Sequence, residues 1–119
     1  MIVDENSKSL IICDLGNARV VRRSLENPKD TQIIIKNILC DGLMMNENGD
    51  LFVSDFKKHE VKRWRKGEKE GAAVASGNGR GNKRNQLNSP GFLFIDRDET
   101  IYVSDRDNQR VAKWIKSVD

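Results

Sequence analysis

The sequence lacks most of the features from which membrane and secreted proteins are recognised. No apolar run approaches the roughly 20 residues that a membrane-spanning helix needs, so no membrane association is expected. The first residues, Met1–Glu5, do not combine a basic region with a following apolar one, so they predict no secretory signal. This absence slightly favours a cytoplasmic location.

Residues for catalysis and metal binding are also scarce, because the chain contains a single histidine and two cysteines. His59 falls in a predicted hairpin turn, which favours a turn residue over a catalytic base. A zinc site needs three or four ligands, and no calcium-loop spacing is present. The glycine-rich stretch 77–83 fails the phosphate-loop pattern, because Asn82 follows Gly81 and no helix is expected after it. We therefore expect no catalytic residue, no metal and no cofactor.

Cys13 and Cys40 lie in or beside apolar runs. A free cysteine in such surroundings behaves as a small hydrophobic residue, and we favour that interpretation over the alternatives. These are a disulfide between the two residues and a reactive thiol.

Charge is abundant but balanced. Charged residues make up 33% of the chain, and the formal net charge is only +3. Acidic and basic residues are interleaved, which predicts a mildly basic surface rather than a polycation. Such a surface permits contact with nucleic acid without requiring it. The length of 119 residues is enough for one modest domain.

One sequence motif occurs three times, in residues 10–23, 51–64 and 101–114. Each copy reads as a strand, an Asp-opened turn and a second strand, which is typical of a β-hairpin. The turn-opening aspartates are Asp14, Asp55 and Asp105, separated by 41 and 50 residues. Elsewhere the apolar residues also alternate with a period of two in short runs, so no helix is expected.

Each hairpin lies inside a predicted unit of four short strands. The expected strands are 2–4, 10–13, 19–23 and 32–36; then 42–45, 51–54, 60–64 and 72–75; then 92–96, 101–104 and 110–114. Repeats of this size with four strands are typical of β-propeller blades, which bury their faces by stacking. The predicted blades are 1–41, 42–90 and 91–119, and the last lacks its fourth strand. Apolar strands such as 33–35 and 92–95 are expected between adjacent blades.

The repeated sequence motif resembles the NHL repeat, and the resemblance covers essentially the whole chain. The matching residues are Asp105, Asn108, Arg110 and Val111 in the third copy, and Asp14, Asn17, Arg19 and Val20 in the first. The second copy departs, with His59 and Glu60 in the Asn and Arg positions. The resemblance implies an all-β fold, an incomplete six-bladed propeller. Either further blades or a second copy of the chain is needed to close such a ring, and the open edges predict self-association.

Two groups of residues are candidates for a role at the turns or surface. In the pairs Asp14–Arg19 and Asp105–Arg110, a charge-assisted hydrogen bond is expected to close the base of the turn. The alternative is an exposed pair worth roughly 0–1 kcal/mol. Candidate contacts with a partner or a polyanion are Arg63, Arg65, Lys66, Arg80, Lys83 and Arg84. The alternative is an ordinary solvated surface, with Trp64 and Trp114 packed at their blades.

The preferred function is a non-catalytic scaffold that binds a protein partner, since a regular repeat comes without a catalytic cluster. RNA binding is the first alternative, because the chain resembles the NHL propellers of tripartite-motif proteins and has a basic excess. The second alternative is part of a lyase-like propeller enzyme whose active residues lie in other blades. A non-enzymatic role is favoured over this last one.

Overall fold

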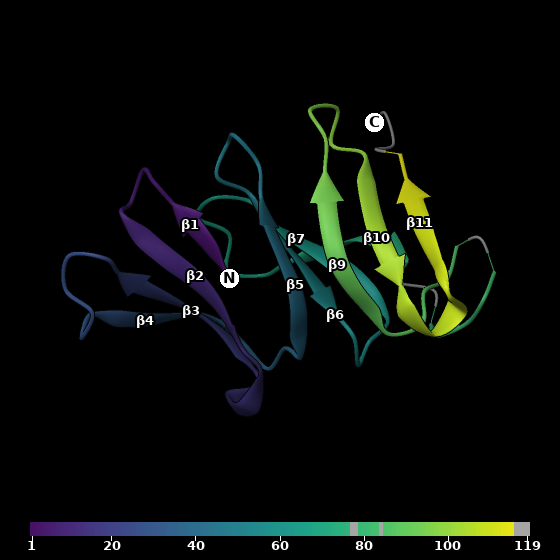
Figure 1. Cartoon of the computed structure of the whole chain (residues 1–119), viewed down its shortest axis with the longest axis horizontal. Helices are drawn as coiled ribbons and strands as arrows, with labels where there is room; N and C mark the ends of the chain where they lie inside the picture. The colour runs from purple at the N-terminus through teal and green to yellow at the C-terminus, as the bar shows by residue number, and fades with distance from the viewer. Residues whose placement is uncertain (77–78, 84, 116–119) are drawn as a thin grey trace.

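In the computed structural model, which describes residues 1–76, 79–83 and 85–115, three antiparallel sheets follow one another along the chain. Figure 1 shows them side by side, with the N-terminal sheet at one end of the molecule and the C-terminal sheet at the other. Within each sheet the strands are ordered as in the sequence. The all-β fold with propeller-like blades that the sequence predicts is therefore confirmed.

We call the three sheets blade 1, blade 2 and blade 3. Blade 1 comprises β1 (Ile2–Asp4), β2 (Ser9–Asp14), β3 (Arg19–Ser24) and β4 (Thr31–Lys36). Blade 2 comprises β5 (Cys40–Met45), β6 (Leu51–Asp55), β7 (Glu60–Trp64) and β8 (Ala72–Ser76). Blade 3 comprises β9 (Pro90–Ile95), β10 (Ile101–Asp105) and β11 (Arg110–Trp114). The two helical segments that the structure describes are single 3-10 turns, η1 (Leu15–Asn17) and η2 (Arg106–Asn108), and neither is long enough to cross a membrane.

The central hairpins of blades 2 and 3 have the same register. Leu51 pairs with Trp64 in blade 2, and Ile101 pairs with Trp114 in blade 3. The connecting turn requires a left-handed residue at its last position, which is Ala18, His59 or Gln109, with φ between 51° and 56°. None of these is glycine or asparagine, so ordinary turn propensity does not identify the position.

The blades bury their apolar residues against each other. Ile11 and Val20 of blade 1 share a core with Leu51 and Val53 of blade 2. On its opposite face, blade 2 places Phe52 in a second core with residues of blade 3. Blade 2 is thus covered on both faces, and each fully buried large side chain contributes about 1.5–3 kcal/mol.

The outward faces of blades 1 and 3 have no such cover. Ile35 is buried as expected, but Ile33 is exposed, and so are Phe92 and Phe94 on β9. Within the described residues, strands 33–35 and 92–95 therefore contact a neighbouring blade on one face only. Successive residues of a regular strand point to opposite faces, which separates Phe92 and Phe94 from Ile95. In β4 a register shift pairs Ile35 with Val20 and Ile33 with Val21, so Ile33 and Ile35 fall on opposite faces.

A covalent bond and a hydrogen bond join neighbouring blades at equivalent positions. Cys13, near the end of β2, forms a disulfide with Cys40, at the start of β5, and their Cα atoms are 5.4 Å apart. The interpretation of two free, apolar cysteines is therefore wrong. Ser54 occupies the position of Cys13 in blade 2, and its hydroxyl donates to the carbonyl of Gly91 in blade 3 at 2.7 Å.

The close approach of blades 2 and 3 requires a glycine at position 42. Its N–H donates to the Ser54 hydroxyl at 2.7 Å. A Cβ atom at this position would collide with the carbonyl oxygen of Gly91. The backbone of β5 therefore lies against blade 3 because residue 42 carries no side chain.

Candidate binding cleft between blades 2 and 3

A cleft of about 380 Å³ opens between the outer strands of blades 2 and 3. Strands β6, β7 and β8 supply one wall, and the β9–β10 turn, β10 and β11 supply the other. The lining residues are Phe52, Arg63, Arg65, Ala72, Ala73, Val74, Glu99, Ile101, Trp114 and Ile115. The volume lies within the usual range of about 300–1,000 Å³ for small-ligand sites.

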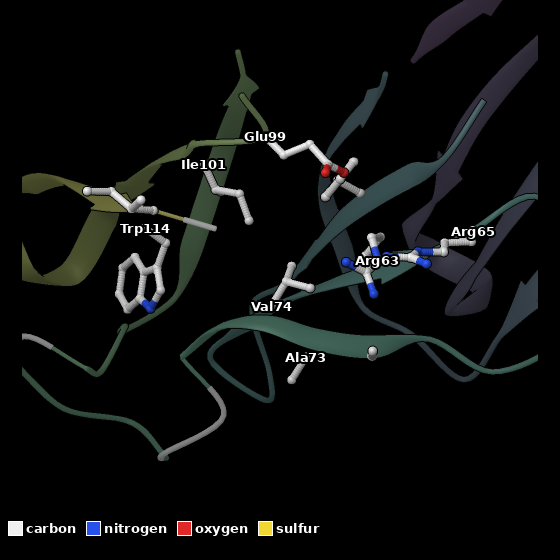
Figure 2. A pocket seen from close by; sticks show the side chains of 10 residues that line it. Arg63, Arg65, Ala73, Val74, Glu99, Ile101 and Trp114 are labelled. Carbon is white, nitrogen blue, oxygen red and sulfur yellow. The ribbon is translucent and has the colours of Figure 1, made fainter. Parts of the chain in front are cut away.

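The cleft is apolar at one end and charged at the other (Figure 2). Trp114 and Ile101 of blade 3 lie at the apolar end, with Val74 of β8 between them and the charged end. Arg63 and Arg65 lie together at the charged end. The arrangement fits a ligand that has an apolar body and an anionic group.

Glu99 reaches the cleft from the β9–β10 turn and extends toward blade 2 (Figure 2). Its carboxylate accepts a long hydrogen bond of 3.5 Å from the side-chain amide of Asn46, which lies in blade 2's β5–β6 turn. A carboxylate at the rim can accept N–H groups from a ligand, and it disfavours a ligand with several negative charges.

Among the described residues, Arg63 and Arg65 lack carboxylate partners of the kind that Arg22 and Arg110 have. Arg22 pairs with Asp4, and Arg110 pairs with Asp105, whereas no ion pair involving Arg63 or Arg65 occurs within the described residues. The Nε atom of Arg63 is buried and has no hydrogen-bond partner there. An unsatisfied buried donor of this kind costs about 1–3 kcal/mol.

The corresponding tryptophan of blade 2 is covered by its own chain. A Cβ atom at Gly71 would lie 2.6 Å from the Trp64 ring, so the turn before β8 lies directly on the indole. Trp64 also packs against the core between blades 1 and 2, and Trp114 against the core between blades 2 and 3. Both tryptophans therefore pack at their blades, and Trp114 in addition lines the cleft.

The structure describes five of the six candidate basic residues, and they lie in two separate places, as their two clusters in the sequence suggest. Arg63 and Arg65 line the cleft, and the exposed Lys66 follows them in the β7–β8 turn, where its N–H donates to Asp50. Arg80 and Lys83 lie in the connector after β8. That connector leaves the blade beside Glu60, at the opposite end of β7, because Ser76 pairs with Glu60. Arg84 lies outside the described residues. The basic residues thus form no single patch.

The Asp–Arg pairs of the turns lie in different surroundings. Arg19 donates through Nε to Asp14 at 2.7 Å, and this guanidinium, followed by the Asn17 amide, lowers the pKa of the Asp14 carboxyl. Arg110 likewise donates to Asp105 at 2.7 Å. The Asp105 side chain is 0% exposed, whereas that of Asp14 is 28% exposed.

In blade 3 the turn also holds the long connector. The backbone N–H of Asn88 donates to Asp105 at 2.6 Å. The Arg110 guanidinium donates to the carbonyl groups of Asn82, Lys83 and Gln86. These contacts assign a structural role to the pair, since the guanidinium is already used within the chain.

In blade 2, where His59 and Glu60 replace the Asn and Arg of the repeat, other contacts hold the turn. Asp55 accepts the N–H groups of Lys57 and Lys58, both at 3.1 Å. His59, as expected, lies in the turn, and its Nδ1 accepts the N–H of Ser89 at 2.9 Å. Within the described part of the chain, no group of three His, Cys, Asp or Glu residues is placed to hold a metal ion.

Sequence reasoning identified Arg63 and Arg65 but missed the residues that complete the cleft. Val74 lies in the predicted strand 72–75, and Glu99 lies between the predicted strands 92–96 and 101–104, so neither position suggests a role at the cleft. Their proximity to the arginines depends on how blade 3 packs on blade 2, and no local pattern reports this packing.

No protein-family model matches the sequence, and no curated protein is recognisably similar to it. Solved structures do resemble the fold. An auxiliary nutrient binding protein from Bacteroides thetaiotaomicron matches 93% of this chain with a TM-score of 0.71 and 13% identity. An inactive H270A virginiamycin B lyase from Staphylococcus aureus, with quinupristin, matches 99% with a TM-score of 0.56 and 10% identity. A streptogramin B lyase matches 94% with a TM-score of 0.59 and 10% identity.

These likenesses establish a propeller-like fold for the chain. They do not extend to activity, because the identities are low. This chain spans 35% of the nutrient binding protein and 41–42% of the two lyases.

Proposed function

We propose that this chain is a non-catalytic, NHL-type propeller module that binds a protein partner, and that the cleft between blades 2 and 3 holds an acidic segment of that partner. The observation that carries the proposal is the placement of two guanidinium groups and an indole in one cleft, with no ion pair to either guanidinium from the residues that the structure describes. The repeated Asp–Arg turn contacts support the NHL assignment.

A peptide carboxylate satisfies the charged end of the cleft. A guanidinium binds a carboxylate through two parallel N–H donors, and such charge-assisted bonds are the strong ones. Trp114 and Val74 offer an apolar surface for a neighbouring side chain of the same segment.

Glu99 favours a peptide over a nucleic acid. Peptide N–H groups can donate hydrogen bonds to Glu99, whereas the phosphate groups of a nucleic acid present only acceptors. The carboxylate also repels a polyanion at short range. RNA binding is the second candidate, since Trp114 could stack on a base while the two arginines contact phosphates.

The test is a binding measurement with a peptide library in which Asp or Glu neighbours an aromatic or aliphatic residue, read by fluorescence anisotropy. Loss of a charge-assisted bond is worth about 1.5–3 kcal/mol, so Arg63→Gln and Arg65→Gln should each weaken binding about 10- to 100-fold. Lys58→Gln is the control, because it removes one positive charge from the turn at the opposite end of β7.

Single-stranded RNA oligonucleotides are measured in parallel over a range of salt concentrations. The proposal predicts that acidic peptides bind and that RNA binds weakly. RNA affinity that falls steeply with salt and exceeds that of every peptide would instead support the second candidate. Peptide binding that is equally reduced by Lys58→Gln would show that only net charge matters and would refute the assignment to this cleft.

A further inference from the structure

The two end blades expose faces that are buried at every other position of the repeat. We call the face that a blade turns toward the next blade in sequence its trailing face, and the opposite one its leading face. Val20, Val61 and Val111 occupy the same position on the three trailing faces. Val20 and Val61 are 0% exposed, whereas Val111 is 72% exposed.

The surroundings of Val111 repeat those of its buried counterparts. In blade 2, Phe52 lies between Met44 and Arg63 across the sheet. In blade 3, Tyr102 lies in the same way between Phe94 and Lys113. The trailing face of blade 3 therefore keeps the apolar pattern that blade 2 uses to pack on its neighbour.

Blade 1 leaves the complementary surface partly exposed, since Leu10 and Ile12 are half-buried and Val21 beside Ile12 is buried. Leu51 and Val53 lie on the leading face of blade 2, and Ile101 and Val103 on that of blade 3; all four are buried by the preceding blade. Leu10 and Ile12 hold these positions in blade 1. Val3 is 57% exposed there, whereas its counterpart in blade 3, Ile95, is 6% exposed.

A further position near the end of the second strand of each blade bonds to the following blade where one is present. Cys13 and Ser54 both bond to the following blade, through the disulfide to Cys40 and the hydrogen bond to Gly91. Ser104 occupies this position in blade 3. Its hydroxyl accepts the N–H of Phe92 at 2.8 Å, as Ser54 accepts that of Gly42. Within the described residues, no following blade supplies an acceptor for its proton.

We propose that a second copy of this chain covers both faces, with the trailing face of each blade 3 packed on the leading face of the other copy's blade 1. The internal interfaces show that these two kinds of face fit each other. Such a contact is head-to-tail, and it ends in a closed ring when the rotation between units permits closure. Propellers contain about four to eight blades. Two copies with three blades each give six blades, which is the only multiple of three within that range.

The test is sedimentation velocity over a range of concentrations, with far-UV circular dichroism as a check of folding. The wild-type chain should sediment as a discrete dimer of twice 13.6 kDa. Val111→Glu and Val3→Glu each place a charge in the proposed contact, and each should weaken dimerisation by at least about 30-fold. Leu25→Glu, at an exposed apolar residue in the β3–β4 loop, should leave the dimer unchanged.

Mixing the two variants distinguishes head-to-tail from symmetric contacts. Val3→Glu retains an intact trailing face and Val111→Glu an intact leading face, so a mixture can form one contact and should recover dimers that neither variant forms alone. A wild-type monomer at all concentrations would overturn the proposal, as would polydisperse larger assemblies. A dimer that survives Val3→Glu would also overturn it, because it would indicate pairing of two blade 3 faces.

Discussion

The three turn-opening aspartates allow one sequence position to be compared in three environments. Asp105 is fully buried and accepts hydrogen bonds from Asn88, Asn108 and Arg110. Asp55 is also buried, but within the described residues it accepts two backbone N–H groups and no guanidinium. Asp14 is partly exposed and bonds to Asn17 and Arg19. We therefore expect replacement by alanine to destabilise the protein most at Asp105 and least at Asp14.

The magnitude at Asp105 follows from what its removal leaves behind. Loss of one member of a buried ion pair costs about 3–5 kcal/mol. The Arg110 side chain is 33% exposed and can recover some hydration, so we expect Asp105→Ala to lower the free energy of unfolding by about 2–4 kcal/mol. Asp55→Ala loses two hydrogen bonds of about 0.5–1.5 kcal/mol each. Asp105→Asn keeps one acceptor in the same volume and should fall between wild type and Asp105→Ala.

The assay is urea unfolding at one fixed protein concentration, followed by tryptophan fluorescence. A change of midpoint with a constant slope reports stability alone. An effect of Asp105→Ala no larger than that of Asp14→Ala would refute the reasoning. It would mean that burial of the carboxylate and its bond to the connector contribute nothing beyond an exposed turn pair.

Two further predictions concern the disulfide and the acid stability. Cys13 and Cys40 are 27 residues apart, so the loop-entropy model predicts that Cys13→Ser with Cys40→Ser lowers the free energy of unfolding by about 3.5 kcal/mol. The same loss should follow reduction of the wild-type protein, and two titratable thiols before reduction would contradict the bond. The Ser7 hydroxyl, followed by Arg22, holds the pKa of Asp4 below its ordinary 3.8 despite burial. Because the folded pKa is depressed, this stabilisation is present above the unfolded pKa and is lost as the pH falls through the folded one. Asp4→Asn should therefore flatten the acid side of the stability–pH curve, and an unchanged curve would exclude Asp4 as its source.

Much of the fold could be predicted from the sequence because strands and turns are set locally. The β-hairpin of 101–114 carries its alternating pattern, its Asp-opened turn and its length within a few consecutive residues. Three copies in phase then indicate stacked blades, because one small sheet cannot cover its own faces. The strands observed begin and end close to the predicted ones, although β5 and β9 each start two residues earlier.

Only part of the candidate site could be predicted from the sequence. Arg63 and Arg65 are close in sequence and lie on one strand and its end, so they could be grouped. Trp114 and Glu99 join them only through the packing of blade 3 on blade 2. Arg80 and Lys83 belong to a second basic cluster in the sequence, and the register of β7 and β8 places the connector that carries them at the other end of the blade.

The sequence by itself determined the strands, the hairpin turns and the period of the repeat, because short-range alternation and turn chemistry act between residues that are neighbours in the chain. Only the tertiary structure decided that Cys13 bonds to Cys40, which faces of the end blades are uncovered, and that an indole and two guanidinium groups share a cleft. These features depend on side chains that meet across blade interfaces, where the relative placement of whole sheets, and no local pattern, sets which atoms come into contact.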